Sequence, residues 1–88
     1  MHWDVVEVKP EANCSLWVRF ADGLSGHIRL NPEELSGALA PLRDAAFFDR
    51  VFLDHGAVAW PGEIDLAPDA MYDAVQDAKA GEVVMLPR

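Results

Sequence analysis

The chain has 88 residues, of which 51% are hydrophobic and 25% charged, close to the averages of globular proteins. This length supports one hydrophobic core, so we expect a single domain over residues 1–88 and exclude a disordered chain. The net charge of −8 disfavours direct nucleic-acid binding, which depends on basic groups that displace counterions. Such a charge either maintains solubility or steers a basic protein partner to the surface, and both alternatives stay open.

Cys14 is the only cysteine, so neither an internal disulfide nor a paired-cysteine zinc site is expected. The first residues lack the basic and apolar regions of an export signal, and no apolar run approaches the roughly 20 residues of a membrane span. We therefore expect a cytoplasmic protein with no membrane association.

The first third of the chain predicts three strands, because apolar and polar residues alternate there or β-branched residues are enriched. These strands are expected over residues 3–8, 15–20 and 24–30. The first should end at Lys9-Pro10, since proline removes a donor from the strand ladder. Asp22-Gly23 lies between the second and third strands and predicts a tight hairpin.

Short helices and a second hairpin are expected next. Asn31 caps a helical turn that Gly37 ends, and Asp44 caps a second short helix whose Phe47 and Phe48 face inward. Two strands follow over residues 51–54 and 57–60, joined by a glycine-containing loop. Pro61-Gly62 should terminate this hairpin.

A C-terminal helix begins at Pro68 and ends near Gly81, with an apolar stripe at intervals of three and four residues. The stripe consists of Met71, Ala74, Val75 and Ala78. Residues 83–87 form either an edge strand or a loose tail. The order strand, strand, strand, helix, strand, strand, helix predicts an α+β domain: a mainly antiparallel sheet with the short helices and the C-terminal helix on one face.

Three aspartates, Asp69, Asp73 and Asp77, recur every four residues along this helix and form a row beside its apolar stripe. Asp77 lies near the negative end of the helix dipole, so helix stability does not explain the row. The row is a solvated face, a contact for a basic partner, or, with least support, a site of metal binding or acid–base chemistry.

A second candidate surface is the polar face of the first hairpin, where Trp17 and Arg19 project together beside Arg29 of the next strand. Exposed Trp and Arg are frequent in binding hot spots. The alternative is that helices cover this face and place Trp17 in the core.

No set of residues predicts catalysis. Neither a nucleophile elbow nor a phosphate-binding glycine loop is present, and the spacing of His2, His27 and His55 matches no familiar metal site. Cys14 has no basic neighbour to activate its thiol. We therefore predict no catalytic residue, no metal and no cofactor, and we expect that the protein is not an enzyme.

Several stretches, "VVEVKP", "LWVRFADG", "PLRDAAFFDRV" and "WPGEIDLAPDAMYDAV", resemble in order the signatures of a bacterial family of short domains of unknown function, number 2442. The resemblance spans about residues 3–76. Its most specific part is a strand-to-helix junction with the residues Trp60, Pro61, Asp65, Pro68, Asp69 and Tyr72. The departure is Gly62-Glu63-Ile64, where many members carry an Asn-Gly turn.

The resemblance implies a small α+β fold without established catalytic residues. Some relatives carry the domain before a helix-turn-helix domain, for which 88 residues leave no room. Others resemble members of two-gene cassettes, which implies an antitoxin-like or regulatory role.

Our leading hypothesis is a non-enzymatic interaction module, an acidic antitoxin-like partner of a basic protein, that uses Asp69, Asp73 and Asp77 and also Trp17 with Arg19. The alternative is a small-ligand or metal-binding domain, conceivably an enzyme, built from the residues Trp60, Glu63, Asp65 and Tyr72. Three Trp in so small a domain are also compatible with a homodimer.

Overall fold

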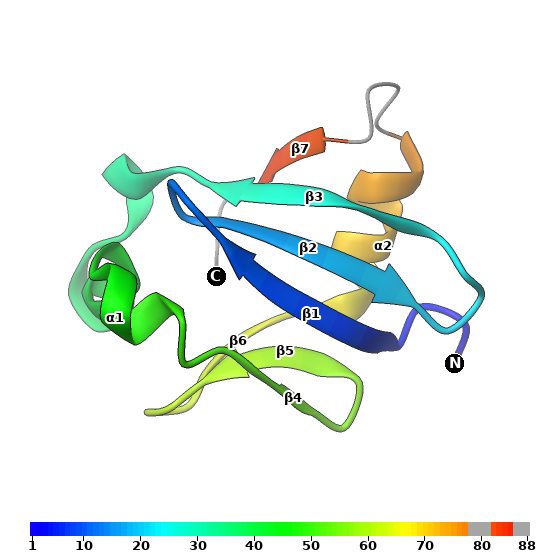
Figure 1. The fold of residues 1–88 in the computed structure, drawn as a ribbon, viewed down its shortest axis with the longest axis horizontal. Coiled ribbons are helices and arrows are strands. Elements are labelled where there is room, and N and C mark those ends of the chain that lie inside the picture. The colour runs from blue at the N-terminus through cyan, green and yellow to red at the C-terminus, as the bar shows by residue number, and fades with distance from the viewer. Residues whose placement is uncertain (78–81, 86–88) are drawn as a thin grey trace.

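The computed structural model describes residues 1–77 and 82–85 and confirms the α+β class. The expected single sheet is instead two sheets that share one core (Figure 1). Sheet A has the order β1-β2-β3-β7 and consists of β1 (Val5–Glu11), β2 (Ser15–Phe20), β3 (Ser25–Leu30) and β7 (Glu82–Met85). Sheet B has the order β4-β5-β6 and consists of β4 (Phe52–Asp54), β5 (Ala57–Trp60) and β6 (Ile64–Leu66).

The first strand is longer than expected, because β1 continues through Lys9-Pro10 to Glu11. Pro10 lies opposite Leu16 of β2, and β1 is an edge strand because β2 is its only partner strand within the described residues. An edge strand tolerates proline where the missing N–H would not have joined a ladder. The prediction that Lys9-Pro10 ends the strand was therefore wrong.

The tight hairpin at Asp22-Gly23 is confirmed. The amide of Gly23 donates to the Phe20 carbonyl at 2.9 Å, and the amide of Leu24 donates to the Asp22 side chain at 3.0 Å. Gly23 has a φ of +95°, a left-handed conformation that glycine adopts without a Cβ clash. The turn sets the register in which Trp17 of β2 lies opposite His27 of β3.

Short helices lie at one end of the sheets, on the left in Figure 1, rather than over a sheet face. They are the 3₁₀ helices η1 (Pro32–Glu34) and η2 (Gly37–Arg43) and the helix α1 (Ala45–Phe48). Both predicted caps form: Asn31 accepts from the Glu33 amide at 3.1 Å and Asp44 from the Ala46 amide at 3.0 Å. Gly37 does not end the first helix as expected but begins η2, with a φ of +59°.

The second hairpin forms as predicted between β4 and β5, with left-handed φ values at His55 and Gly56. Pro61-Gly62, however, does not terminate the sheet. It leads into β6, which pairs antiparallel with β5, and Gly62 and Glu63 both take positive φ in this turn. The alternation of buried Ile64, exposed Asp65 and buried Leu66 is the period-two signal of this missed strand.

The C-terminal helix α2 (Pro68–Asp77) begins at the predicted proline. It covers the inner face of sheet A and buries Met71, Tyr72 and Val75, while Ala74 is half-buried (Figure 1). The predicted stripe residue Ala78 and the predicted stop Gly81 lie outside the described residues. Of the two alternatives for the C-terminus, the edge strand forms: β7 runs parallel to β3.

The core lies between the two sheets and α2, closed at one end by the short helices. Its buried members are Val5, Leu16, Val18, Phe20, Ile28, Leu30, Leu35, Leu42, Phe48, Val58, Trp60, Ile64, Leu66, Met71, Tyr72 and Val75. Trp60 is 1% exposed, and its indole N–H donates to the Phe48 carbonyl at 2.8 Å. This bond ties sheet B to α1. No helix among the described residues is long and apolar enough to cross a lipid bilayer.

Candidate functional site

The outer face of sheet A carries Trp17, Arg19 and Arg29, as the alternation in the sequence predicts. Trp17 is half-buried, while Arg19 and Arg29 are exposed. α2 contacts the opposite face, where the ring centroids of Tyr72 and the buried Phe20 lie 5.1 Å apart. Of the two alternatives for Trp17, the structure therefore shows the outward one.

The cations of this outer face are largely engaged by neighbouring acids. Arg19 Nη2 lies 3.1 Å from Glu7 Oε1, and Lys9 Nζ lies 3.5 Å from Glu7 Oε2 and 5.3 Å from the centre of the Trp17 ring. The hydrogen bond from Arg19 lowers the pKa of Glu7. His27 Nδ1 lies 2.8 Å from Glu11 Oε1. Glu7 and Glu11 therefore offset part of the positive charge on this face.

The aspartate row lies on the far side of sheet A. Asp69, Asp73 and Asp77 are all exposed along α2, which packs on the inner face. The structure therefore does not bring the row together with Trp17 and Arg19: the two candidate surfaces face opposite directions. One flat partner surface cannot contact both.

The acidic row is part of a larger asymmetry of charge. Between Arg50 and Lys79 the sequence contains no Lys or Arg, and this stretch builds sheet B and α2. Its six acids are Asp54, Glu63, Asp65, Asp69, Asp73 and Asp77. All six side chains are exposed, and among the described residues none of them pairs with Lys or Arg. These six residues form the acidic surface, whose carboxylates no Lys or Arg of the described residues pairs with.

Three of the four residues of the alternative ligand site, Trp60, Glu63 and Asp65, line one hollow, whereas Tyr72 does not. Trp60 is buried with its N–H bonded, and Glu63 and Asp65 lie on the outside of sheet B. Tyr72 lies on α2 instead, where its hydroxyl donates to the Asp22 carboxylate of the β2–β3 turn. The hydrogen bond lowers the pKa of Asp22 and raises the pKa of Tyr72. The family-signature junction is thus divided between the core, the outside of sheet B and α2.

A hollow of about 430 Å³ lies on the outer face of sheet B, and its lining includes three residues of the alternative ligand site that the sequence suggested. Its axis is a cross-strand row in which Ala59 of β5 pairs with Phe52 on one side and Asp65 on the other. Ala59 shares its side of the sheet with the exposed Phe52 and Asp65, and at 5% exposed it forms the floor of the hollow. The sequence did not predict that Phe52, Asp54 and Ala59 also line the hollow, because the pairing of β4, β5 and β6 brings them there.

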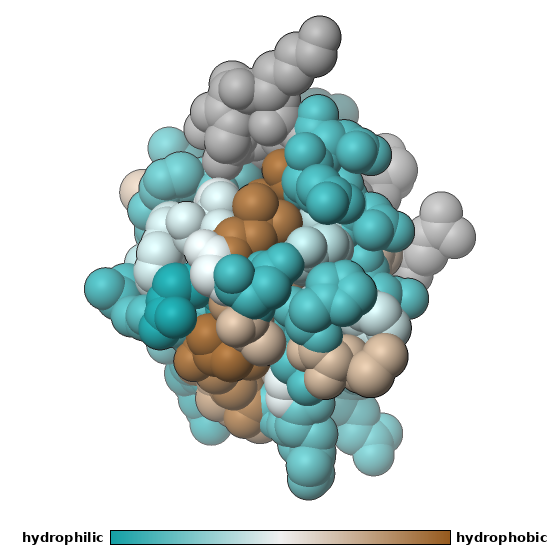
Figure 2. Space-filling model, turned by 90° about the vertical axis from the view of Figure 1, so that its right-hand side faces the viewer, coloured by the Kyte–Doolittle hydropathy of each residue, from teal (hydrophilic) through white to brown (hydrophobic). Residues whose placement is uncertain are grey.

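Exposed large apolar side chains are few on the described surface. They are Met1, Val6, Phe52 and Leu53. Figure 2 shows one side of the molecule as mostly hydrophilic, with smaller apolar areas above and below its centre. The acidic surface is therefore accompanied by only limited apolar contact area, which gives Phe52 at the edge of the hollow particular weight.

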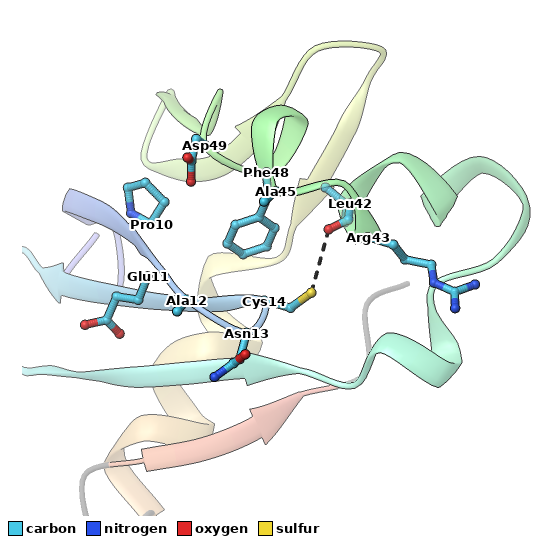
Figure 3. Close-up of a pocket in the computed structure, with 10 residues that line it drawn as sticks. All are labelled: Pro10, Glu11, Ala12, Asn13, Cys14, Leu42, Arg43, Ala45, Phe48 and Asp49. Atoms are coloured by element: carbon cyan, nitrogen blue, oxygen red, sulfur yellow. Dashed lines mark hydrogen bonds between the residues drawn. The ribbon is translucent and has the colours of Figure 1, made fainter.

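A second pocket, of about 370 Å³, lies between the β1–β2 turn and the short helices. Cys14 lies in it, half-buried, with Sγ 3.8 Å from the Leu42 carbonyl. Figure 3 shows that the Glu11 and Arg43 side chains extend away from this thiol, so no charged groups converge there. Among the described residues, no group of three or more His, Cys, Asp or Glu side chains is placed to hold a metal ion.

These observations define a small two-sheet α+β domain with exposed acids on sheet B and α2 and a hollow on sheet B. The family model described as "Protein of unknown function (DUF2442)" matches residues 5–77, and the chain belongs to this family. Searches of curated proteins and of solved structures gave no significant match.

Proposed function

We propose that this chain is a non-enzymatic protein-interaction module that binds a basic protein partner, as the acidic, antitoxin-like half of a bacterial two-gene pair. The observation that carries the proposal is the acidic surface on sheet B and α2. Six exposed acids, none of them paired with a Lys or Arg in the part of the chain that the structure describes, create a negative field that attracts a basic surface and speeds its association.

The aspartate row supports the proposal because it lowers helix stability. Like charges four residues apart destabilise a helix by about 0.2–0.5 kcal/mol per pair, and Asp77 also opposes the dipole. Asp69, in the first turn, is favoured by the dipole, but Asp73 and Asp77 are not. Residues that are unfavourable for folding and exposed are well explained by binding.

The experiment is a co-purification from native lysate with the full chain as bait, followed by binding measurements with the recovered partner at rising salt. We expect a basic partner whose affinity falls as the ionic strength rises, because salt screens exposed charges beyond about 10 Å at 0.1 M. A partner that binds equally well at all salt concentrations, or no partner at all, contradicts the proposal.

Two matched double variants sharpen the test. Asp73→Asn with Asp77→Asn removes two charges from the acidic surface, whereas Glu33→Gln with Asp49→Asn removes two exposed charges elsewhere. We expect the first pair to weaken binding while leaving the domain as stable or more stable. Equal effects of the two pairs would show that only the net charge matters.

A further inference from the structure

We propose that the hollow on the outer face of sheet B docks a short basic segment of the partner, with one apolar side chain in the hollow and Lys or Arg side chains on the surrounding acids. The inference rests on the proposed function, since it names the place on the acidic surface where the partner binds and the chemistry of the segment that binds there.

The shape of the hollow follows from the register of three strands. The small side chain of Ala59 lies between Phe52 and Asp65 in one cross-strand row, so a depression remains between two larger side chains. Phe52, at the edge of this depression, is 44% exposed. A depression with an aromatic wall accommodates an aliphatic side chain, because burial against the ring removes apolar surface from water.

The acidic residues around the hollow favour basic side chains in the rest of the bound segment. Asp54, Glu63 and Asp65 line it and are exposed, and no Lys or Arg lines it. The near neighbour of Asp54 is His55, whose Nδ1 lies 2.7 Å from the carboxylate. Guanidinium and ammonium groups form charge-assisted hydrogen bonds with carboxylates, whereas an acidic or purely apolar segment gains nothing from them. A segment that alternates basic and apolar residues fits both features.

A second copy of the chain fits the hollow poorly. If two copies met through this face, their acids would lie opposite each other, and like charges across an interface are destabilising. Self-association of that kind would strengthen as salt rises, because salt screens the repulsion. A basic partner segment shows the opposite salt dependence, so the two occupants are distinguishable.

The test uses the full ¹⁵N-labelled chain and a short peptide of alternating Arg and Leu as the probe. Two control peptides replace Leu by Ser or Arg by Glu. We expect the Arg/Leu peptide to shift the amide resonances of Phe52, Ala59 and Asp65, and to bind more tightly than either control. An Arg/Ser peptide that binds equally well would overturn the inference, because the hollow would then contribute no apolar contact.

Two variants of equal exposure give the decisive comparison. Phe52 and Val6 are both 44% exposed, and Phe52→Ser and Val6→Ser leave the net charge unchanged. We expect Phe52→Ser to weaken binding of the Arg/Leu peptide about tenfold and Val6→Ser to leave it unchanged. Thermal unfolding checks that both variants are folded. Equal affinities of the two variants would overturn the inference.

The outcome separates this inference from the proposed function. Resonance shifts confined to α2, with salt-sensitive binding that Phe52→Ser does not affect, overturn the docking site but leave the acidic interaction module standing. Failure of the peptide to bind overturns the docking site, while the co-purified basic partner still decides the function. Self-association that strengthens with salt and is lost in Phe52→Ser assigns the hollow to a second copy instead.

Discussion

The Tyr72 hydroxyl on α2 donates a hydrogen bond to the Asp22 carboxylate, 50 residues earlier in the chain, and so fastens the helix to the β2–β3 turn. The same tyrosine ring packs edge-on against Phe20 and His2, with distances between ring centroids of 5.1 Å and 4.9 Å. Asp22 is also tied to the backbone of its own turn through the Leu24 amide. A signature residue of the family therefore acts in the packing of α2 on sheet A.

We expect Tyr72→Phe to lower the melting temperature near neutral pH, because the ring is kept and only this hydrogen bond is lost. The bond lowers the pKa of Asp22 from its ordinary value of 3.8, so its stabilising effect is present above that pH and is lost as the pH falls through the folded-state pKa. It raises the pKa of Tyr72 above 10.0, so the effect is also lost at strongly alkaline pH.

Thermal unfolding of wild type and Tyr72→Phe across this range checks the prediction. The gap between the two melting temperatures should be widest between the two pKa values and should narrow below the folded-state pKa of Asp22. A gap that is constant with pH would show that the hydroxyl acts through something other than the Asp22 carboxylate.

Trp60→Phe tests the bond between sheet B and α1. The change deletes the N–H that donates to the Phe48 carbonyl and removes ring volume from a site that is 1% exposed. The Phe48 carbonyl keeps its bond from the Val51 amide at 3.2 Å, so the loss comes from one hydrogen bond and a cavity. We expect a decrease of about 1–3 kcal/mol in the free energy of unfolding, measured by urea denaturation.

The control is Trp17→Phe on the outer face of sheet A, where the side chain is half-buried. We expect it to cost less than about 1 kcal/mol, because surface substitutions usually change stability by about 0.5 kcal/mol. If Trp17→Phe lowers the free energy of unfolding more than Trp60→Phe does, this would contradict the finding that Trp60 lies in the core and Trp17 on the outer face.

Two glycine substitutions separate backbone strain from steric clash. Gly62 and Gly56 both have positive φ, +90° and +83°, so alanine strains either site by about 1–2 kcal/mol. A Cβ at Gly62 would meet nothing within 4 Å, whereas one at Gly56 would lie 2.9 Å from Asp4 Cγ. We expect Gly56→Ala to cost about 1–3 kcal/mol more than Gly62→Ala in urea denaturation. Equal costs would exclude the close approach of the β4–β5 turn to Asp4.

Glu63 adopts a φ of +65° next to Gly62, in the turn that leads into β6. Glu63→Gly should raise the free energy of unfolding by about 0.5–1 kcal/mol, since relief of about 1–2 kcal/mol of strain exceeds the added entropy of glycine in the unfolded chain. The control Glu63→Gln removes the same charge, keeps the strain and should leave stability unchanged. If Glu63→Gly is less stable than the wild type, the backbone at Glu63 is not strained as we infer.

Much of the local structure was predictable because short-range patterns determine it. The hairpin turns at Asp22-Gly23 and at His55-Gly56, the caps at Asn31 and Asp44, and the start of α2 at Pro68 all depend on neighbouring residues. The continuation of β1 through Pro10 was missed, because whether a proline is tolerated depends on which edge of the strand is paired.

The candidate surfaces were likewise predictable only in part. The spacing of Asp69, Asp73 and Asp77 and the alternation around Trp17 placed these side chains on the surface, as the structure has them. Whether Trp17 was covered depended on which face α2 packs against, and that choice is made by contacts such as Phe20 with Tyr72. Residue spacing along one element carries no information on that choice.

The sequence by itself determined the fold class, the acidity of the segment from Asp54 to Asp77 and the strand and helix periods, because these depend on composition and on residues a few positions apart. Only the tertiary structure decided that α2 packs on the face of sheet A opposite Trp17, and that Ala59 lies between Phe52 and Asp65. Those relationships arise from strand register and from burial of a common core, which join residues far apart in the chain.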